Sequence, residues 1–121
     1  MTTTIAFKQQ MNVRLKQFAL RIIKLYQSLP KTGEAQVIGK QMLRSGSSVA
    51  ANYRAACRAR SGKEFFSKVS IVTEEADKTL FWLELICEAE VMTVSRLESI
   101  MQEAMEILKI IAVTRRHSQP A

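Results

Sequence analysis

Residues 44–65 read RSGSSVAANYRAACRARSGKEF. The stretch is rich in glycine, alanine and serine, whose small side chains let two helices approach closely. At 100° per residue, Arg44, Arg54, Arg58 and the preceding Lys40 fall within an arc of about 80° on one helix. The pattern therefore predicts a helix that packs tightly on one side and presents a basic stripe on the other.

The four residues Ser61–Glu64, SGKE, are typical of a capping box. In this motif the hydroxyl of Ser61 accepts a hydrogen bond from the Glu64 amide, and the Glu64 carboxylate accepts one from the Ser61 amide. A helix is therefore expected to begin here. Apolar residues at helical spacing continue from Phe65 to Cys87, which predicts that this helix reaches about Glu90.

Two further helices are predicted outside this central pair. Apolar side chains recur at helical spacing in both segments, and no segment alternates with the period of a strand. Pro30 and the KTG at 31–33 separate the first helix from the second, and a second capping-box pattern, SRLE, opens the last. The expected helices span about 8–28, 34–58, 61–90 and 95–114.

Short connections make sequential helices antiparallel neighbours. With 121 residues, the chain is long enough for one domain with a substantial core but not for two. The sequence therefore predicts an all-α, up-down-up-down antiparallel four-helix bundle as a single domain over 1–121. Its termini, 1–7 and 115–121, are expected to be flexible.

The helix expected at 61–90 carries a second apolar stripe, well over 90° from the first. It contains Ile71, Lys78, Trp82 and Leu85, with Phe81 beside it. A helix in a monomeric bundle buries one face, so the extra stripe predicts an interface between subunits. The alternative is a wide buried face within a tightly packed monomer.

The formal net charge of +7 is unevenly distributed. Residues 1–60 contain eleven Lys and Arg and one acid, which gives 11 − 1 = +10, whereas residues 61–121 contain seven bases and ten acids, which gives 7 − 10 = −3. One interpretation is a surface for an anionic partner, most commonly nucleic acid. The other is solubility together with pairing between a basic and an acidic helix layer.

Catalytic and metal-binding patterns are missing from the sequence. The single histidine, His117, excludes the paired Glu-x-x-His motifs of a di-iron bundle, and three scattered Cys and His residues are too few for a zinc site. Cys57 lies among arginines, but no histidine or second cysteine stands near it in sequence to support nucleophilic catalysis. We therefore expect no enzymatic activity, no metal and no cofactor.

Cys57 and Cys87 are expected to lie too far apart in antiparallel helices for a disulfide, which is typical of reduced cytoplasmic proteins. No apolar stretch approaches the length of a membrane span, because Glu84 interrupts the longest one. The sequence therefore predicts a cytoplasmic protein that does not enter a membrane.

The central stretch resembles a four-helix-bundle family described as ribosomal-RNA intervening-sequence proteins. The resemblance rests on the order and spacing of Arg44, Ser48-Val49, Asn52, the basic run Arg58–Arg60 and Lys63-Glu64-Phe65, together with KLY at 24–26, LPK at 29–31 and LFWLELI at 80–86. Many members follow the asparagine with Ile-Ala-Glu-Gly. This chain instead has YRAA at 53–56, which removes an acid and adds a cation.

The resemblance implies a homo-oligomeric bundle, most often a ring-like pentamer, with no established enzymatic activity. A related accessory protein of diversity-generating retroelements is a basic pentamer that binds nucleic acid and a reverse transcriptase. Nucleic acid and a partner protein such as a reverse transcriptase are therefore expected as possible partners of this chain.

These observations lead to one functional hypothesis and one alternative. The hypothesis is a non-enzymatic basic homo-oligomer that binds RNA or single-stranded DNA through phosphate contacts. The alternative is a protein-interaction scaffold with no nucleic-acid role. The predicted phosphate-binding residues are Arg14, Arg21, Lys24, Lys40, Arg44, Arg54, Arg58 and Arg60.

Overall fold

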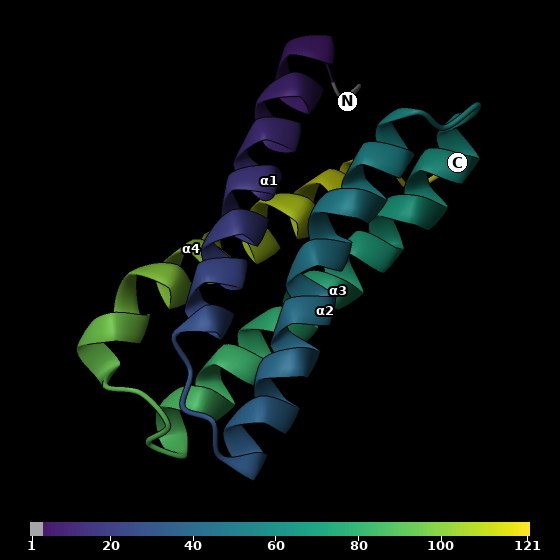
Figure 1. Cartoon of the computed structure of the whole chain (residues 1–121). Helices are drawn as coiled ribbons and strands as arrows, with labels where there is room; N and C mark the ends of the chain where they lie inside the picture. The colour runs from purple at the N-terminus through teal and green to yellow at the C-terminus, as the bar shows by residue number, and fades with distance from the viewer. Residues whose placement is uncertain (1–3) are drawn as a thin grey trace.

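The computed structural model describes residues 4–121, which form four α-helices (Figure 1). The helices are α1 (Ile5–Gln27), α2 (Gly33–Cys57), α3 (Gly62–Glu88) and α4 (Val94–His117). They run alternately up and down, joined by the short connections 28–32, 58–61 and 89–93. The predicted all-α four-helix bundle is confirmed.

The four pairs of neighbouring helices differ in how extensively they pack against each other. The packing is most extensive between α2 and α3, and α1 and α4 each pack against one of these two helices. By contrast, α1 and α4 meet over only a short region, because α4 crosses behind α1 at an angle (Figure 1). The α1–α4 side is therefore the most open side of the bundle.

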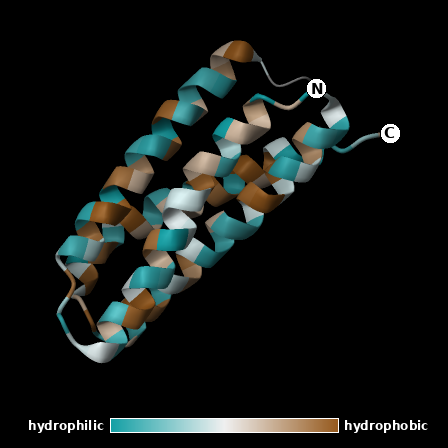
Figure 2. Ribbon diagram, turned by 45° about the vertical axis from the view of Figure 1, so that its right-hand side comes forward, coloured by the Kyte–Doolittle hydropathy of each residue, from teal (hydrophilic) through white to brown (hydrophobic). Residues whose placement is uncertain are grey.

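The core is formed by the apolar faces that the helical spacing predicts. Its largest fully buried side chains include Phe18 and Ile22 from α1, Tyr53 from α2, Leu83 from α3 and Ile107 from α4. Figure 2 shows that hydrophobic and hydrophilic residues alternate along each helix, as expected for helices with one buried face. Burial of this continuous apolar surface is the main stabilising contribution to such a bundle.

The small residues of α2 allow α1 to approach closely. Gly46 is buried, and a Cβ atom added to it would lie 3.0 Å from two side-chain carbons of Ile22. Because Ile22 is itself fully buried and β-branched, it has little room to move away. The tight packing expected for the stretch 44–60 is therefore present at this contact.

The two predicted capping boxes have different outcomes. At the start of α3 the Ser61 hydroxyl accepts a hydrogen bond from the Glu64 amide at 3.1 Å, as predicted. The Glu64 carboxylate instead accepts one from Arg60 at 3.4 Å. The box predicted at Ser95 is wrong, because α4 begins one residue earlier and its N-cap residue is Thr93, whose side chain caps no backbone amide.

Both outer helices extend beyond their predicted ends. α1 begins at Ile5 rather than near residue 8, because the Thr4 hydroxyl caps the helix by accepting a hydrogen bond from the Phe7 amide at 3.1 Å. α4 continues to His117, where the sequence predicted a flexible segment from 115 onward. The remaining part of the N-terminal prediction, residues 1–3, lies outside the described residues.

The extra turn of α4 is held by one side chain. The guanidinium of Arg115 donates a hydrogen bond to the Ser70 hydroxyl at 2.8 Å and stacks over the ring of Phe66, 4.7 Å from its centroid. Both partners belong to α3. These contacts hold the end of α4 against α3. They join residues far apart in the sequence, so the local hydrophobic pattern could not predict them.

α3 ends in a Schellman motif without glycine. The Val91 amide donates to the Ile86 carbonyl at 3.0 Å and the Glu90 amide donates to the Cys87 carbonyl at 3.1 Å. Glu90 adopts the left-handed conformation that this motif requires, with φ of 57°. A residue other than glycine costs about 1 kcal/mol there, and the missing glycine explains why the sequence pattern placed the helix end two residues too late.

No helix within residues 4–121 combines the length and apolar character needed to cross a membrane.

Candidate nucleic-acid interface

Four cations of α2 lie together on its outer surface. Lys40, Arg44, Arg54 and Arg58 are all exposed, and within residues 4–121 none of them forms an ion pair. We call these four residues the α2 stripe. Their charges are available to an anionic partner, as the sequence predicted for this part of the surface.

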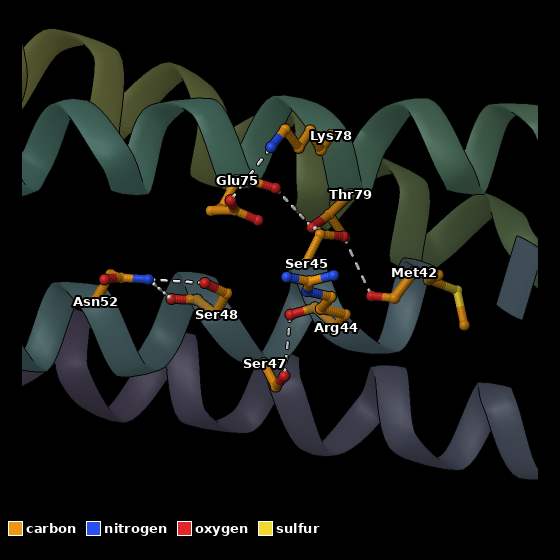
Figure 3. Close-up of polar contacts among 9 residues, drawn as sticks. All are labelled: Met42, Arg44, Ser45, Ser47, Ser48, Asn52, Glu75, Lys78 and Thr79. Atoms are coloured by element: carbon orange, nitrogen blue, oxygen red, sulfur yellow. Dashed lines mark hydrogen bonds and ion pairs between the residues drawn. The ribbon is translucent and has the colours of Figure 1, made fainter. Parts of the chain in front are cut away.

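Another side of α2 makes a buried polar contact with α3. The buried Ser45 hydroxyl accepts a hydrogen bond from the Thr79 hydroxyl at 2.9 Å (Figure 3). Nearby, the Asn52 amide group donates to the carbonyl and the hydroxyl of Ser48 within α2 itself, at 2.9 and 2.7 Å. The Ser45–Thr79 bond joins α2 to α3, so the side of α2 that carries Ser45, and not the α2 stripe, lies against α3.

A groove of about 530 Å³ runs between the first half of α1 and the second half of α2. We call it the α1–α2 groove. Three of its lining residues are cationic and none is acidic. The lining residues are Asn12, Val13, Lys16, Ala50, Ala51, Arg54, Cys57 and Arg58.

The polar part of this groove lies around Cys57. The Asn12 amide group donates a hydrogen bond to the Cys57 sulfur at 3.5 Å. Behind it, the hydroxyl of the buried Tyr53 has no hydrogen-bond partner within the described part of the chain. Burial, followed by the nearby Cys57 thiol, raises the pKa of Tyr53 above its usual value, so this phenol stays a neutral donor near pH 7.

A second basic hollow, of about 320 Å³, lies between α1 and α4. Arg21 and Lys24 from α1 and Arg96 from α4 line it, together with Leu25, Ser28 and Ile100. Arg21 donates a hydrogen bond to the Ser99 hydroxyl at 2.9 Å and remains exposed. Arg21 and Lys24 therefore lie on a different side of α1 from the α1–α2 groove.

Arg14 does not belong to the exposed basic surface, and this corrects the sequence prediction. Its guanidinium makes two hydrogen bonds to the Glu103 carboxylate of α4, at 2.9 and 2.7 Å, and lies 3.4 Å from Glu106. Sequence reasoning could not detect this pairing, because the partners are 89 residues apart. Arg14 therefore joins α1 to α4 across the most open seam of the bundle.

The Arg14–Glu103 pair predicts a pH-dependent contribution to stability. Hydrogen bonds from Arg14 lower the pKa of Glu103 below its usual value. The stabilisation is therefore present at pH 7, which is above the pKa of Glu103 in the unfolded chain. It is lost as the pH falls through the pKa of Glu103 in the folded protein. We expect Glu103→Gln to lower the free energy of unfolding by about 1–2 kcal/mol at pH 7, measured by urea denaturation.

The difference between wild type and Glu103→Gln should shrink steadily below about pH 4. Glu106→Gln is the matched control, since the Glu106 side chain is 60% exposed and lies farther from Arg14. It should change stability by less than about 0.5 kcal/mol. An equal loss in both variants at every pH would contradict this account.

Arg60, the last of the predicted phosphate-binding residues, is almost fully exposed. Its only ion pair among the described residues joins it to Glu64 at 3.4 Å, with 90% of the Arg60 side chain exposed. An exposed pair of this kind contributes little to stability and is easily exchanged for another anion. Arg60 therefore remains available at the end of α2, close to Arg58.

The second apolar stripe of α3 is only partly covered. Phe81 is 52% exposed and Ile71 is 42% exposed, whereas Trp82 and Leu85 are half-buried. Phe81 and Trp82 contact each other edge to face, with 5.0 Å between ring centroids. Lys78 is exposed beside them and lies 3.4 Å from Glu75. The monomer therefore leaves a large part of this stripe open to solvent.

Two cations that line the α1–α2 groove or the hollow between α1 and α4 were absent from the predicted phosphate-binding residues. Lys16 faces the α1–α2 groove, and its position on the polar side of α1 was visible in the sequence. Arg96 belongs to the half of the chain with excess acid, and only the crossing of α4 behind α1 brings it next to Arg21 and Lys24. No local signal marked Arg96.

Groups of side chains suited to a metal ion are not found in the described part of the chain. Within residues 4–121, no three His, Cys, Asp or Glu residues come together as ligands. Cys57 and Cys87 are both free and half-buried. The described residues offer exposed cations and two hollows lined by cations.

Comparison with known proteins identifies the family. No curated protein matches the chain. The crystal structure of a protein of unknown function from the S23 ribosomal protein family of Bacteroides thetaiotaomicron matches with a TM-score of 0.83 and 36% sequence identity, over 90% of this chain and 97% of that one. Residues 8–113 match the family described as 23S rRNA-intervening sequence protein. The chain belongs to the 23S rRNA-intervening sequence protein family.

Proposed function

We propose that this protein is a non-enzymatic, basic homo-oligomer that binds single-stranded RNA or DNA through contacts with the phosphate backbone. The observation that carries the proposal is the α2 stripe, whose four cations are exposed and make no ion pair within the described residues. The α1–α2 groove adds Lys16 to two of these cations. RNA is the first ligand to test, because the family takes its name from sequences that interrupt 23S rRNA.

The proposed binding is mainly electrostatic and weakly specific for sequence. The α2 stripe carries no exposed aromatic side chain on which a base could stack. Phosphate contacts position a strand without identifying its bases, so affinity should depend on charge and strandedness more than on sequence.

We also propose that the apolar stripe of α3 is where copies of the chain associate. Its open residues, Phe81 and Ile71, lie on the same helix surface as the exposed acids Glu74 and Asp77. Acids next to the stripe would repel nucleic acid, so the stripe is expected to bind a protein surface instead. The resemblance adds the expectation that this partner is another copy of the chain, with a pentamer as the form to test.

The test is a binding titration with labelled single-stranded RNA across a salt series, with the mass of the free protein measured by light scattering. Three to five phosphate contacts per subunit should give a slope of about −2 to −3.5 in a plot of log K against log salt. A slope near zero, or no binding at low salt, would contradict the proposal. If high salt instead dissociates the oligomer and no RNA binds, the scaffold function is favoured, and partner proteins such as a reverse transcriptase become the next candidates.

A further inference from the structure

The α1–α2 groove is hollow because its walls are made of small side chains. Ala50 and Ala51 of α2 face Val13 of α1, and together they leave a cavity of about 530 Å³. Ligand sites typically have volumes of about 300–1,000 Å³, with mostly apolar walls and a few placed polar groups. The groove is open to solvent, and its volume lies within this range.

The cations of the groove are arranged around one space. Lys16 reaches it from α1, and Arg54 and Arg58 reach it from α2. No acid lines the groove, and none of the three forms an ion pair within residues 4–121. Three like charges around one cavity repel one another, and an anion placed between them would relieve that repulsion.

The floor of the groove adds one polar group, the Asn12 amide, whose hydrogen bond is weak. The Asn12 amide group donates to the Cys57 sulfur at 3.5 Å, and because sulfur is a weak acceptor, an oxygen acceptor would replace this bond with a stronger one. Tyr53 lies next to Cys57 in the core, is fully buried and does not line the groove. The Asn12 amide thus complements the cationic rim.

We infer that the α1–α2 groove admits one phosphodiester unit of a bound nucleic-acid strand, with the phosphate held by Lys16, Arg54 and Arg58. The sugar then lies along Ala51 and Val13, and Asn12 donates to an oxygen of the ligand. The inference rests on the proposed function and names the place where the strand enters the protein. It requires that affinity depends on the empty volume of the groove as well as on its charge, and that Cys57 is covered when RNA binds.

The first test fills the groove without changing its charge. Ala51 is exposed, so Ala51→Leu should fold normally and occupy part of the space beside Arg54. We expect RNA affinity to fall by roughly tenfold, because the inserted unit no longer fits. Ala112→Leu on the exposed surface of α4 is the matched control and should bind as wild type does. Wild-type affinity in a folded Ala51→Leu variant would overturn the inference.

The second test uses the two cysteines as reporters in the unmodified protein. Both are free and half-buried, but only Cys57 lines the groove. Saturating single-stranded RNA should slow the reaction of Cys57 with N-ethylmaleimide several-fold and leave Cys87 unchanged, as measured by mass spectrometry of peptides. Uridine monophosphate, a free source of the same phosphate chemistry, should protect Cys57 only at far higher concentration.

The outcomes separate this inference from the proposed function. RNA binding without protection of Cys57 would overturn the groove assignment and leave the proposed function standing. Equal protection by RNA and by uridine monophosphate at the same concentration would overturn the strand as the ligand of the groove. Absence of RNA binding at low salt would overturn both the inference and the proposed function.

Discussion

Reversing Arg44, Arg54 and Arg58 together to glutamate should abolish RNA binding while leaving the fold intact. All three side chains are exposed and unpaired within residues 4–121, so the reversals remove no ion pair that stabilises the described part of the fold. Each reversal removes a phosphate contact and places an acid against the strand. We expect the dissociation constant measured by fluorescence anisotropy to rise by more than about 100-fold, with circular dichroism and light scattering unchanged.

The matched control changes the charge equally at other places. Three reversals lower the net charge from +7 by six, to +1, wherever they are made. The control residues are Lys31, Lys63 and Lys109. They are exposed and do not belong to the α2 stripe, to the α1–α2 groove or to the hollow between α1 and α4. Their combined reversal to glutamate should raise the dissociation constant by less than about tenfold, through the weakened overall field alone. Equal losses in the two triple variants would show that net charge, and not the α2 stripe, carries the binding.

Phe81→Arg should dissociate the oligomer into monomers. Phe81 is 52% exposed, contacts Trp82 edge to face and lies beside the other residues of the apolar stripe of α3, where subunits are proposed to meet. A guanidinium that enters an apolar interface loses its hydration, and this desolvation costs several kcal/mol of association free energy in each interface. The mass measured by light scattering should fall to about that of one chain, 13.7 kDa.

The control for this variant is Val113→Arg on α4. Val113 is 40% exposed and lies on a helix surface away from the α3 stripe, so the substitution adds the same charge without entering the proposed interface. Its assembly should match that of the wild type. A monomeric wild-type protein, or an unchanged mass in Phe81→Arg, would show that the α3 stripe does not join subunits.

The triple reversal of Arg44, Arg54 and Arg58 and the Phe81→Arg substitution should affect two independent surfaces. The α2 stripe and the apolar stripe of α3 belong to different helices, and the side of α2 that contacts Thr79 of α3 carries the buried Ser45 and none of the stripe residues. Phe81→Arg should therefore retain binding by each subunit and lose only the gain in avidity that several linked sites provide. That gain should be visible as weaker binding to long RNA with little change for short RNA.

Much of the fold could be predicted because its signals are local. The helical spacing of Met11, Leu15 and Phe18, the break at Pro30 and the cap at Ser61 each depend on residues a few positions apart. The α2 stripe is also a local pattern, because its members share one helix and their directions follow from the helical repeat. These predictions needed no knowledge of which helix would lie beside which.

The predicted helix ends were wrong where a contact with another helix or an unusual backbone conformation determined the true end. α4 reaches His117 because Arg115 finds Phe66 and Ser70 on α3. α3 ends at Glu88 because Glu90 adopts a left-handed conformation that is usually reserved for glycine. Neither cause lies in the local hydrophobic pattern from which helix ends were predicted.

The sequence by itself determined four amphipathic helices, their order and the basic surface of α2, because periodicity, caps and breakers act between near neighbours along the chain. Only the tertiary structure decided what the individual charges do. It turned Arg14 inward toward Glu103, brought Arg96 beside Lys24 and opened a groove in front of Cys57. Each of these depends on how α1 lies against α2 and α4, and helix packing is set by the whole core rather than by any one segment.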